Sequence, residues 1–249
     1  LLLYSSDVSF SDKTIELSEA HLKRYDLYDP RRLHIYYSIL KDYTNESDAL
    51  KYLTPAKEII RRYDLDLTED AIKFKYIEHE IALRNGDFEE SRKILLECFE
   101  ILDAITISQL RDYKLYLQIL FDLSVSTNNY SEQQIYIKIA EKIVDHYDQY
   151  IDDKTLVDFY KYKGLNLLYK KPLKIESAEK ANSFFEKSLK LMEELDLQSN
   201  YFFGEIYYFI SMSKIFQGLY YYDLDSVKKA NLLYDEFFHY LDKSVEYGN

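Results

Sequence analysis

The residue types that most often do chemistry in proteins are scattered along this chain without the spacing of a catalytic or metal site. Glu78, His79 and Glu80 are consecutive, but neighbouring positions of a helix point about 100 degrees apart, so these side chains cannot converge on one ion. The other histidines stand apart from one another: His21, His34, His146 and His239. The only cysteine, Cys98, is interpreted as a buried structural thiol rather than a nucleophile. The sequence therefore predicts no enzyme, no metal and no cofactor.

A second group of residues suits binding better than catalysis, because polar or aromatic side chains interrupt apolar helical segments. We expect six of them to face an inner surface and contact a peptide: Glu80, Arg84, Gln118, Tyr162, Asn166 and Tyr208. The amide of Asn166 can donate to and accept from an extended peptide backbone at once. Replacing Asn166 or Arg84 by Ala should cost about 1–3 kcal/mol of affinity and little stability. The alternative is that the amides bond a neighbouring helix or water, and that the 27 tyrosines fill core and boundary positions.

The composition indicates an ordered, nearly all-α chain and limits its partners. Only 5 Gly and 3 Pro occur in 249 residues, too few for a β fold or a glycine-rich phosphate loop, while 47% hydrophobic residues argue against disorder. A net charge of -12 predicts repulsion from DNA and from anionic membranes. No apolar run approaches the ~18 residues of a membrane span. The single cysteine fits a reducing, cytoplasmic location.

The strongest pattern is a helix signature that occurs three times: a small residue, a large apolar residue four positions later and a third contact residue three beyond it. Its copies are Ser91, Leu95, Cys98; Ala181, Phe185, Ser188; and Ala230, Tyr234, Phe237. This spacing puts each set on one helical face, where the small residue lets a neighbouring helix approach. The signature is similar to the second helix of a tetratricopeptide-like pair. The resemblance implies one helical-repeat domain over 1–249, a right-handed superhelical solenoid of degenerate pairs.

Capping residues and breakers predict about eleven helices. Thr68 to Arg84 and Asp87 to about Leu102 form the clearest hairpin, separated by Asn85 and Gly86. Four further boundaries are expected: a helix start at Ser11 or Asp12, a break or kink at Pro55 with Thr54 capping the helix after it, a capping box from Ser131 to Gln134, and a helix end at Phe216 before Gly218 and the Tyr220 to Tyr222 run.

Three segments together resemble the C-terminal domain of Rgg and PlcR type (RRNPP) quorum-sensing regulators. They are the irregular helix pairs, the stretch 159–169 followed by 181–195, and the apolar helix 113–121. The resemblance implies a cytoplasmic receptor of Gram-positive bacteria that binds an imported signalling peptide, dimerises through its C-terminal repeats and regulates transcription. It also implies that DNA is contacted only by an N-terminal helix-turn-helix domain, which we expect to be missing from this chain.

The leading hypothesis is therefore a peptide-sensing and dimerisation domain in which a short, mainly apolar peptide lies in a concave groove. Occupancy would shift an equilibrium between two dimer arrangements. We expect a homodimer that uses Phe237, Phe238, Tyr240 and Leu241, because these residues offer more apolar surface than one facing helix can cover. The rival hypothesis is a constitutive tetratricopeptide scaffold or co-chaperone that grips a protein tail. A helical phosphatase is the third possibility, and it lacks a catalytic constellation.

Overall fold

The computed structural model describes residues 8–40, 46–105, 111–127, 129–169, 173–196, 200–223 and 226–248. The described chain is all-α, with eleven α-helices and one short 3-10 helix. It divides into two compact units, Leu1–Leu115 and Tyr116–Asn249. No helix in the described part is long and apolar enough to cross a membrane.

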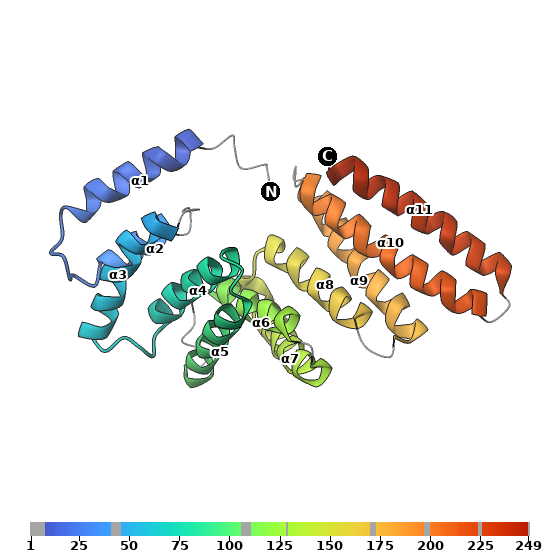
Figure 1. Ribbon diagram of the computed structural model, residues 1–249, viewed down its shortest axis with the longest axis horizontal. Coiled ribbons are helices and arrows are strands. Elements are labelled where there is room, and N and C mark those ends of the chain that lie inside the picture. Colours follow the sequence, from blue (N-terminus) through green and yellow to red (C-terminus); the bar gives the residue numbers. More distant parts are fainter. Residues whose placement is uncertain are drawn as a thin grey trace. The chain divides into compact units, whose positions relative to one another are not determined.

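The first unit holds five helices: α1 (Val8–Leu22), α2 (Arg32–Leu40), α3 (Glu46–Arg62), α4 (Glu69–Arg84) and α5 (Phe88–Ala104). Its core is formed by apolar residues of α2, α3 and α4, among them Leu33, Ile39, Ala56, Ile59 and Phe74. Pairs of contacts show that α4 and α5 are antiparallel, since Ile72 meets Cys98 near one end and His79 meets Ser91 near the other (Figure 1). The hairpin that the capping residues predict is therefore confirmed.

The second unit contains most of α6 (Tyr113–Ser126), then α7 (Tyr130–Tyr147), η2 (Asp148–Tyr150), α8 (Asp153–Leu168), α9 (Ile175–Glu194), α10 (Asn200–Asp223) and α11 (Val227–Gly248). Its core includes Ala181, Phe185, Met192, Ile206 and Ile210. Helices α10 and α11 lie side by side along their lengths (Figure 1). They are antiparallel, because Tyr207 packs against Tyr247 while Gly218 lies under Tyr234.

Helix ends use side-chain caps and left-handed residues. Thr68, Asp87 and Asp152 each accept a hydrogen bond from a backbone N–H in the first turn of α4, α5 and α8. Gly86 has φ 78°, and Asp87 N–H then reaches back to the carbonyl of Ala82 at 2.9 Å. Asp64 adopts φ 54° after α3, with Leu65 N–H bonded to Ile60. Aspartate thus takes a role that glycine usually fills, in a chain with only 5 Gly.

Four predicted boundaries are wrong, and in each case the helix begins earlier or continues. Helix α1 starts at Val8, before Ser11, and α7 starts at Tyr130, where Asn129 Oδ1 rather than Ser131 accepts from the first turn. Pro55 lies inside α3 without ending it. Buried residues on both sides of the proline explain this, because the continuous apolar face offsets the ~3 kcal/mol cost of a helix-interior proline. They are Ala49, Tyr52, Leu53, Ala56, Ile59 and Ile60.

Helix α10 also continues past its predicted end, through Gly218 and the tyrosine run to Asp223. Packing against neighbouring helices accounts for this. Lys229 Nζ of α11 lies 3.6 Å from the centre of the Tyr221 ring, and the Tyr221 hydroxyl donates to Glu179 of α9. A glycine and three aromatic residues are poor helix formers alone, but tertiary contacts outweigh their propensity.

The signature residues of the first two copies close their helix pairs as the sequence predicts: Ser91, Leu95, Cys98, Ala181, Phe185 and Ser188 are all buried. In the third copy Ala230 is buried, whereas Tyr234 and Phe237 are half-buried. In the first two copies the third residue points a donor across the pair: Cys98 Sγ toward the carbonyl of Ile72, and Ser188 Oγ toward that of Val157 at 3.0 Å. Burial raises the pKa of the Cys98 thiol to about 12, in keeping with a structural thiol.

In the second and third copies the large signature residue sits over a glycine of the preceding helix, a feature that the sequence analysis missed. A Cβ at Gly164 of α8 would lie 2.4 Å from Phe185, and one at Gly218 of α10 would lie 2.6 Å from Tyr234. Real Cβ atoms do not approach other atoms so closely. The ring therefore occupies the space that any larger residue would need, and the two helices approach closely at that point.

We predict that Gly164→Ala destabilises the protein by about 1–2 kcal/mol, although alanine is the better helix former, because the added methyl clashes with Phe185. Phe185→Ala should cost about 3–5 kcal/mol through the cavity that it leaves. Urea unfolding of Gly164→Ala, Phe185→Leu and the double variant measures the coupling. The double variant should be more stable than the sum of the single changes implies. If the two single changes in the free energy of unfolding simply add in the double variant, the Phe185 ring does not restrict the size of residue 164.

Candidate functional site

The structure separates the six predicted peptide-binding residues between the two units. Glu80 and Arg84 lie on α4 of the first unit, whereas Gln118 lies on α6, Tyr162 and Asn166 on α8, and Tyr208 on α10 of the second. Within the second unit, three of these helices are first members of successive pairs, as the sequence predicts. We therefore build the candidate site from α6, α8 and α10.

Tyr162 lies at the centre of this site. Its ring stacks on Phe121 of α6 with centroids 4.6 Å apart and an interplanar angle of 17°. Burial raises the pKa of the Tyr162 hydroxyl to about 12, and the negative charge of Asp122 contributes further. Gln118, one turn earlier on α6, donates to Asp122 at 3.2 Å. Gln118 and Tyr162 therefore belong to one polar and aromatic surface.

Lys161 is the charged centre of the same surface. It is only 7% exposed, and its ammonium lies 3.2 Å from both Asp158 of its own helix and Glu205 of α10. Burial alone would lower the pKa of Lys161, but Asp158 and Glu205 outweigh this effect and leave the pKa raised. Lys161 therefore stays charged and ties α8 to α10.

We call Gln118, Asp122, Asp158, Lys161, Tyr162 and Glu205 the Tyr162 surface. Its charged members are three carboxylates and one lysine, so its formal charge is negative. The sequence analysis did not identify Lys161, Asp122, Asp158 or Glu205. Lys161 and Glu205 are 44 residues apart. The only local signal was a lysine among the aromatic residues Phe159, Tyr160 and Tyr162.

Asn166 bonds a neighbouring helix, which is the alternative to peptide binding that the sequence left open. It is 7% exposed, its amide nitrogen donates to Gln133 of α7 at 3.4 Å, and its amide oxygen accepts from Gln134. Both polar atoms of the amide are thus engaged between α7 and α8. A peptide would have to displace these bonds to reach them.

Tyr208 and the two residues of the first unit have different surroundings. Tyr208 is 44% exposed on α10 and packs edge-on against Phe209. Burial raises the pKa of the Glu80 carboxyl, and Arg84 partly opposes the shift. Arg84 itself is exposed. Tyr37 of α2 interacts with Glu80. Burial raises the pKa of the Tyr37 hydroxyl to about 12, and the negative charges of Asp112, Glu80 and Glu69 add to this shift.

His79, the central residue of the Glu78–Glu80 stretch, belongs to the helix pair rather than to a site. It is 3% exposed and its Nδ1 lies 2.9 Å from the hydroxyl of Ser91. Burial lowers its pKa, so the neutral ring is favoured. In the described residues, no group of three or more His, Cys, Asp or Glu side chains is placed to hold a metal ion.

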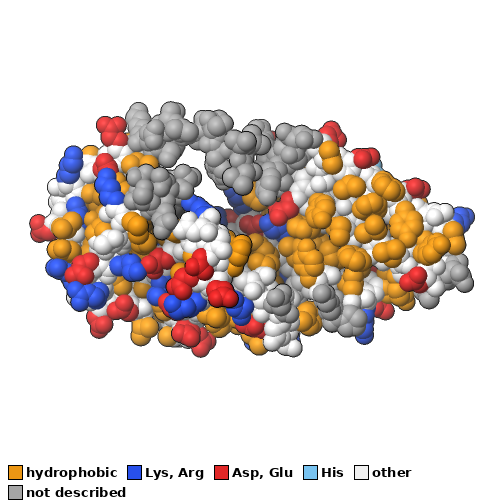
Figure 2. Space-filling model, viewed as in Figure 1, with side chains coloured by type: hydrophobic (Ala, Val, Ile, Leu, Met, Phe, Trp, Pro, Cys, Tyr) orange, Lys and Arg blue, Asp and Glu red, His pale blue; other side chains and the backbone are white. Residues whose placement is uncertain are grey.

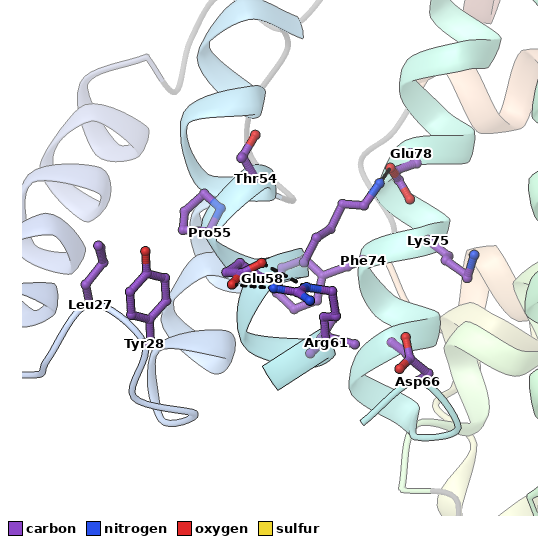
Figure 3. A pocket seen from close by; sticks show the side chains of 13 residues that line it. Leu27, Tyr28, Thr54, Pro55, Glu58, Arg61, Asp66, Phe74, Lys75 and Glu78 are labelled. Carbon is purple, nitrogen blue, oxygen red and sulfur yellow. Dashed lines mark hydrogen bonds and ion pairs between the residues drawn. The ribbon is translucent and has the colours of Figure 1, made fainter. Parts of the chain in front are cut away.

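The first unit contains a pocket of about 690 Å³ between α3, α4 and the segment before α2 (Figure 3). Leu27, Pro55, Ile60, Ala71 and Phe74 give it an apolar lining. Its cations are paired with carboxylates: Lys57 with Glu78, Arg61 with Glu58, and Lys75 with Glu97. The pocket therefore suits an apolar side chain better than a charged ligand.

Of the four residues predicted to form a dimer interface, only Phe238 is exposed. Phe238 is 60% exposed, and Leu241 is half-buried. Tyr240 instead packs into the core of the second unit, where its ring stacks on Tyr207. Phe237 is half-buried, beside Leu233 in the helix and edge-on to Phe238.

Comparisons with known proteins do not identify a family for this chain. No protein-family model matches the chain, and a search of curated proteins finds no significant match.

The buried ionisable groups predict a loss of stability at alkaline pH. The folded protein holds the Tyr162 proton up to a pKa of about 12, above the ordinary value of 10.0, and the pKa of Lys161 is likewise raised above 10.5. Between the ordinary pKa and the raised pKa of the folded state, the unfolded chain loses its protons before the folded protein does. The free energy of unfolding therefore falls as pH rises past about 10. In Tyr162→Phe, the decrease in the free energy of unfolding between neutral pH and pH ~12 should be about 1–2 kcal/mol smaller than in the unmodified protein.

Urea unfolding at neutral and alkaline pH measures the difference. The exposed Tyr222→Phe serves as the matched control. Equal alkaline losses for Tyr162→Phe and the unmodified protein would show that the Tyr162 hydroxyl does not favour its neutral form in the fold.

Proposed function

We propose that this chain is a peptide-sensing helical-repeat domain that binds a short, mainly apolar peptide along α6, α8 and α10. The observation that carries the proposal is the Tyr162 surface, where three first helices bring aromatic rings and polar groups together. The resemblance to Rgg and PlcR type regulators supports a cytoplasmic sensor of an imported signal. In that function the domain controls transcription through a separate DNA-binding domain.

The chemistry of this surface suits a peptide. Tyr162 and the exposed Tyr208, which lies beside this surface three residues after Glu205 on α10, offer ring area for apolar side chains at a small cost in conformational entropy. Gln118 provides an amide, which can donate to and accept from a peptide backbone. Phe202, half-buried on α10, lies with its ring centre 5.7 Å from Lys161 Nζ and extends the aromatic area. Aromatic rings together with amide groups favour a linear peptide over a phosphate or nucleotide ligand.

The charges of the surface also distinguish peptide sensing from the gripping of a protein tail. A carboxylate-gripping repeat needs cations that are free to bind the ligand's terminus. Lys161 instead contacts two carboxylates, and Asp122 adds a third negative charge nearby. A ligand carboxylate placed here would meet net repulsion. The surface therefore favours a peptide whose free carboxyl group lies elsewhere.

A direct test measures binding of synthetic linear octapeptides by fluorescence anisotropy, with apolar sequences compared against polar sequences of equal length. Apolar peptides should bind more tightly, and Tyr208→Ala and Gln118→Ala should each weaken binding about tenfold by removing a ring contact or an amide partner. Tyr150→Ala, which removes a 66% exposed tyrosine of η2, is the matched control and should leave affinity unchanged. Equal affinity for both peptide classes would contradict the proposal.

A second experiment compares each bound peptide with its C-terminally amidated form. Amidation should leave affinity unchanged or increase it, because the negative charge of the Tyr162 surface disfavours a carboxylate. A tenfold or larger loss on amidation would instead favour the scaffold or co-chaperone hypothesis.

A further inference from the structure

The pocket of the first unit has the size and the lining of a small-molecule site. Its volume of about 690 Å³ lies within the roughly 300–1,000 Å³ of ligand pockets in proteins. Ile60, Ala71 and Phe74, which belong to the core of the unit, form its innermost lining. Pro55 of α3 and the side chain of Leu27 complete the apolar part. A ligand bound here would therefore bury apolar surface directly against the core.

The wall that Leu27 and Tyr28 form is held in place by the rest of the unit. Both residues lie in the segment between α1 and α2. The buried Arg32 donates to the carbonyl of Leu27 at 3.1 Å and to that of Leu22 at 2.8 Å. The guanidinium carbon of Arg62 lies 3.5 Å from the centre of the Tyr28 ring. The pocket is therefore pre-formed, which lowers the entropic cost of binding a ligand.

Three polar groups of the lining can accept a hydrogen bond from a ligand. They are the hydroxyls of Tyr28 and Thr54 and the carboxylate of Asp66 (Figure 3). No hydrogen bond or ion pair joins these three side chains to any other part of the chain that the structure describes. Asp66 is exposed, between α3 and α4, and its ionised carboxylate can only accept. The open polar groups therefore favour a ligand that donates hydrogen bonds.

The charges of the lining disfavour an anionic ligand, because each cation among the described lining residues already has a carboxylate partner. The ion pairs are Lys57–Glu78, Arg61–Glu58 and Lys75–Glu97, at 2.6, 2.9 and 2.5 Å. Figure 2 shows basic and acidic side chains intermixed over the helices of the first unit. An anion would have to break one of these pairs, whereas an ammonium group can meet Asp66 without displacing any partner. Charge complementarity of this kind selects between ligands.

We propose that this pocket binds a small organic amine, with the apolar body of the ligand against Pro55 and Phe74 and its ammonium group at Asp66. The apolar body supplies most of the affinity, because it leaves water for an apolar lining. The ammonium group donates a charge-assisted hydrogen bond to the carboxylate, which sets the orientation of the ligand. The site lies within the first unit and is independent of the peptide proposed for the Tyr162 surface.

The first test compares three probes that share an indole ring and differ in their end group: tryptamine, the neutral tryptophol and the anionic indole-3-propionate. The chain contains no Trp, so indole fluorescence reports the probe alone. Titrating the protein into each probe and following anisotropy should give a dissociation constant of about 1 mM or lower for tryptamine. Tryptophol should bind about three- to fivefold more weakly, and indole-3-propionate more weakly still.

Three outcomes of this comparison would overturn the proposal. They are the absence of saturable tryptamine binding, equal affinity for tryptamine and tryptophol, and tighter binding of indole-3-propionate than of tryptamine. The tripeptide Trp-Gly-Gly amide carries an ammonium group beside the same ring and should bind no more tightly than tryptamine. Tighter binding of the tripeptide would assign the pocket to the amino end of a peptide instead of a small amine.

The second test locates the ammonium group with a matched pair of charge variants. Asp66→Asn should abolish the preference for tryptamine over tryptophol, because the amide is neutral, and should leave tryptophol binding unchanged. Asp64→Asn removes the same charge two residues away, outside the lining, and should keep the preference. Equal effects of the two variants would contradict a contact between the ammonium group and Asp66.

The third test locates the apolar body with two leucines of similar exposure. Leu27 lines the pocket and is 53% exposed, whereas Leu67 is 66% exposed and lies outside the lining. Leu27→Ala should weaken tryptamine and tryptophol alike by about fivefold, because part of the apolar wall is lost. Leu67→Ala should leave both affinities unchanged. Equal affinities in the two variants would show that the probes bind elsewhere and would overturn the proposal.

Discussion

The rest of the structure depends on the close approach of paired helices, with a large side chain of one helix seated over a small residue of the other. Phe185 over Gly164 and Tyr234 over Gly218 show this constraint most directly, since neither glycine has space for a Cβ. Ala181 and Ala230, both fully buried, provide the small residues on the second helix. Buried Cys98 and Ser188 then direct a donor at a carbonyl across the pair. Shape and hydrogen bonding together set how each pair is aligned.

This alignment positions the candidate site. The α8–α9 and α10–α11 pairs pack on each other, so α8 and α10 become neighbours, and Lys161 can reach Glu205. Burying a lysine is costly unless its charge is compensated, and here two carboxylates keep it ionised. Tyr162 extends the same surface to α6 by stacking on Phe121. The site is therefore a consequence of how the pairs pack, and its negative charge disfavours a ligand carboxylate.

The same packing also explains the apolar surface of the α10–α11 hairpin. Helices α10 and α11 cover each other, and α10 also packs on α9. An outermost repeat of a helical array normally presents a polar surface to solvent. Exposed Leu219, Phe238 and Val245 depart from that rule.

The sequence by itself determined the all-α class, the antiparallel pairs, the number of helices and the burial of seven of the nine signature residues. These features depend on local spacing, caps and turns, which act within a few residues. Tertiary structure decided that α3 continues through Pro55 and that α10 continues through Gly218, because contacts on both sides outweigh local propensity. It also decided that Asn166 bonds Gln133 and Gln134 and that Lys161 joins Asp158 to Glu205. Most of those partners come from other helices, and helical spacing shows which face a residue occupies but not which side chain meets it there.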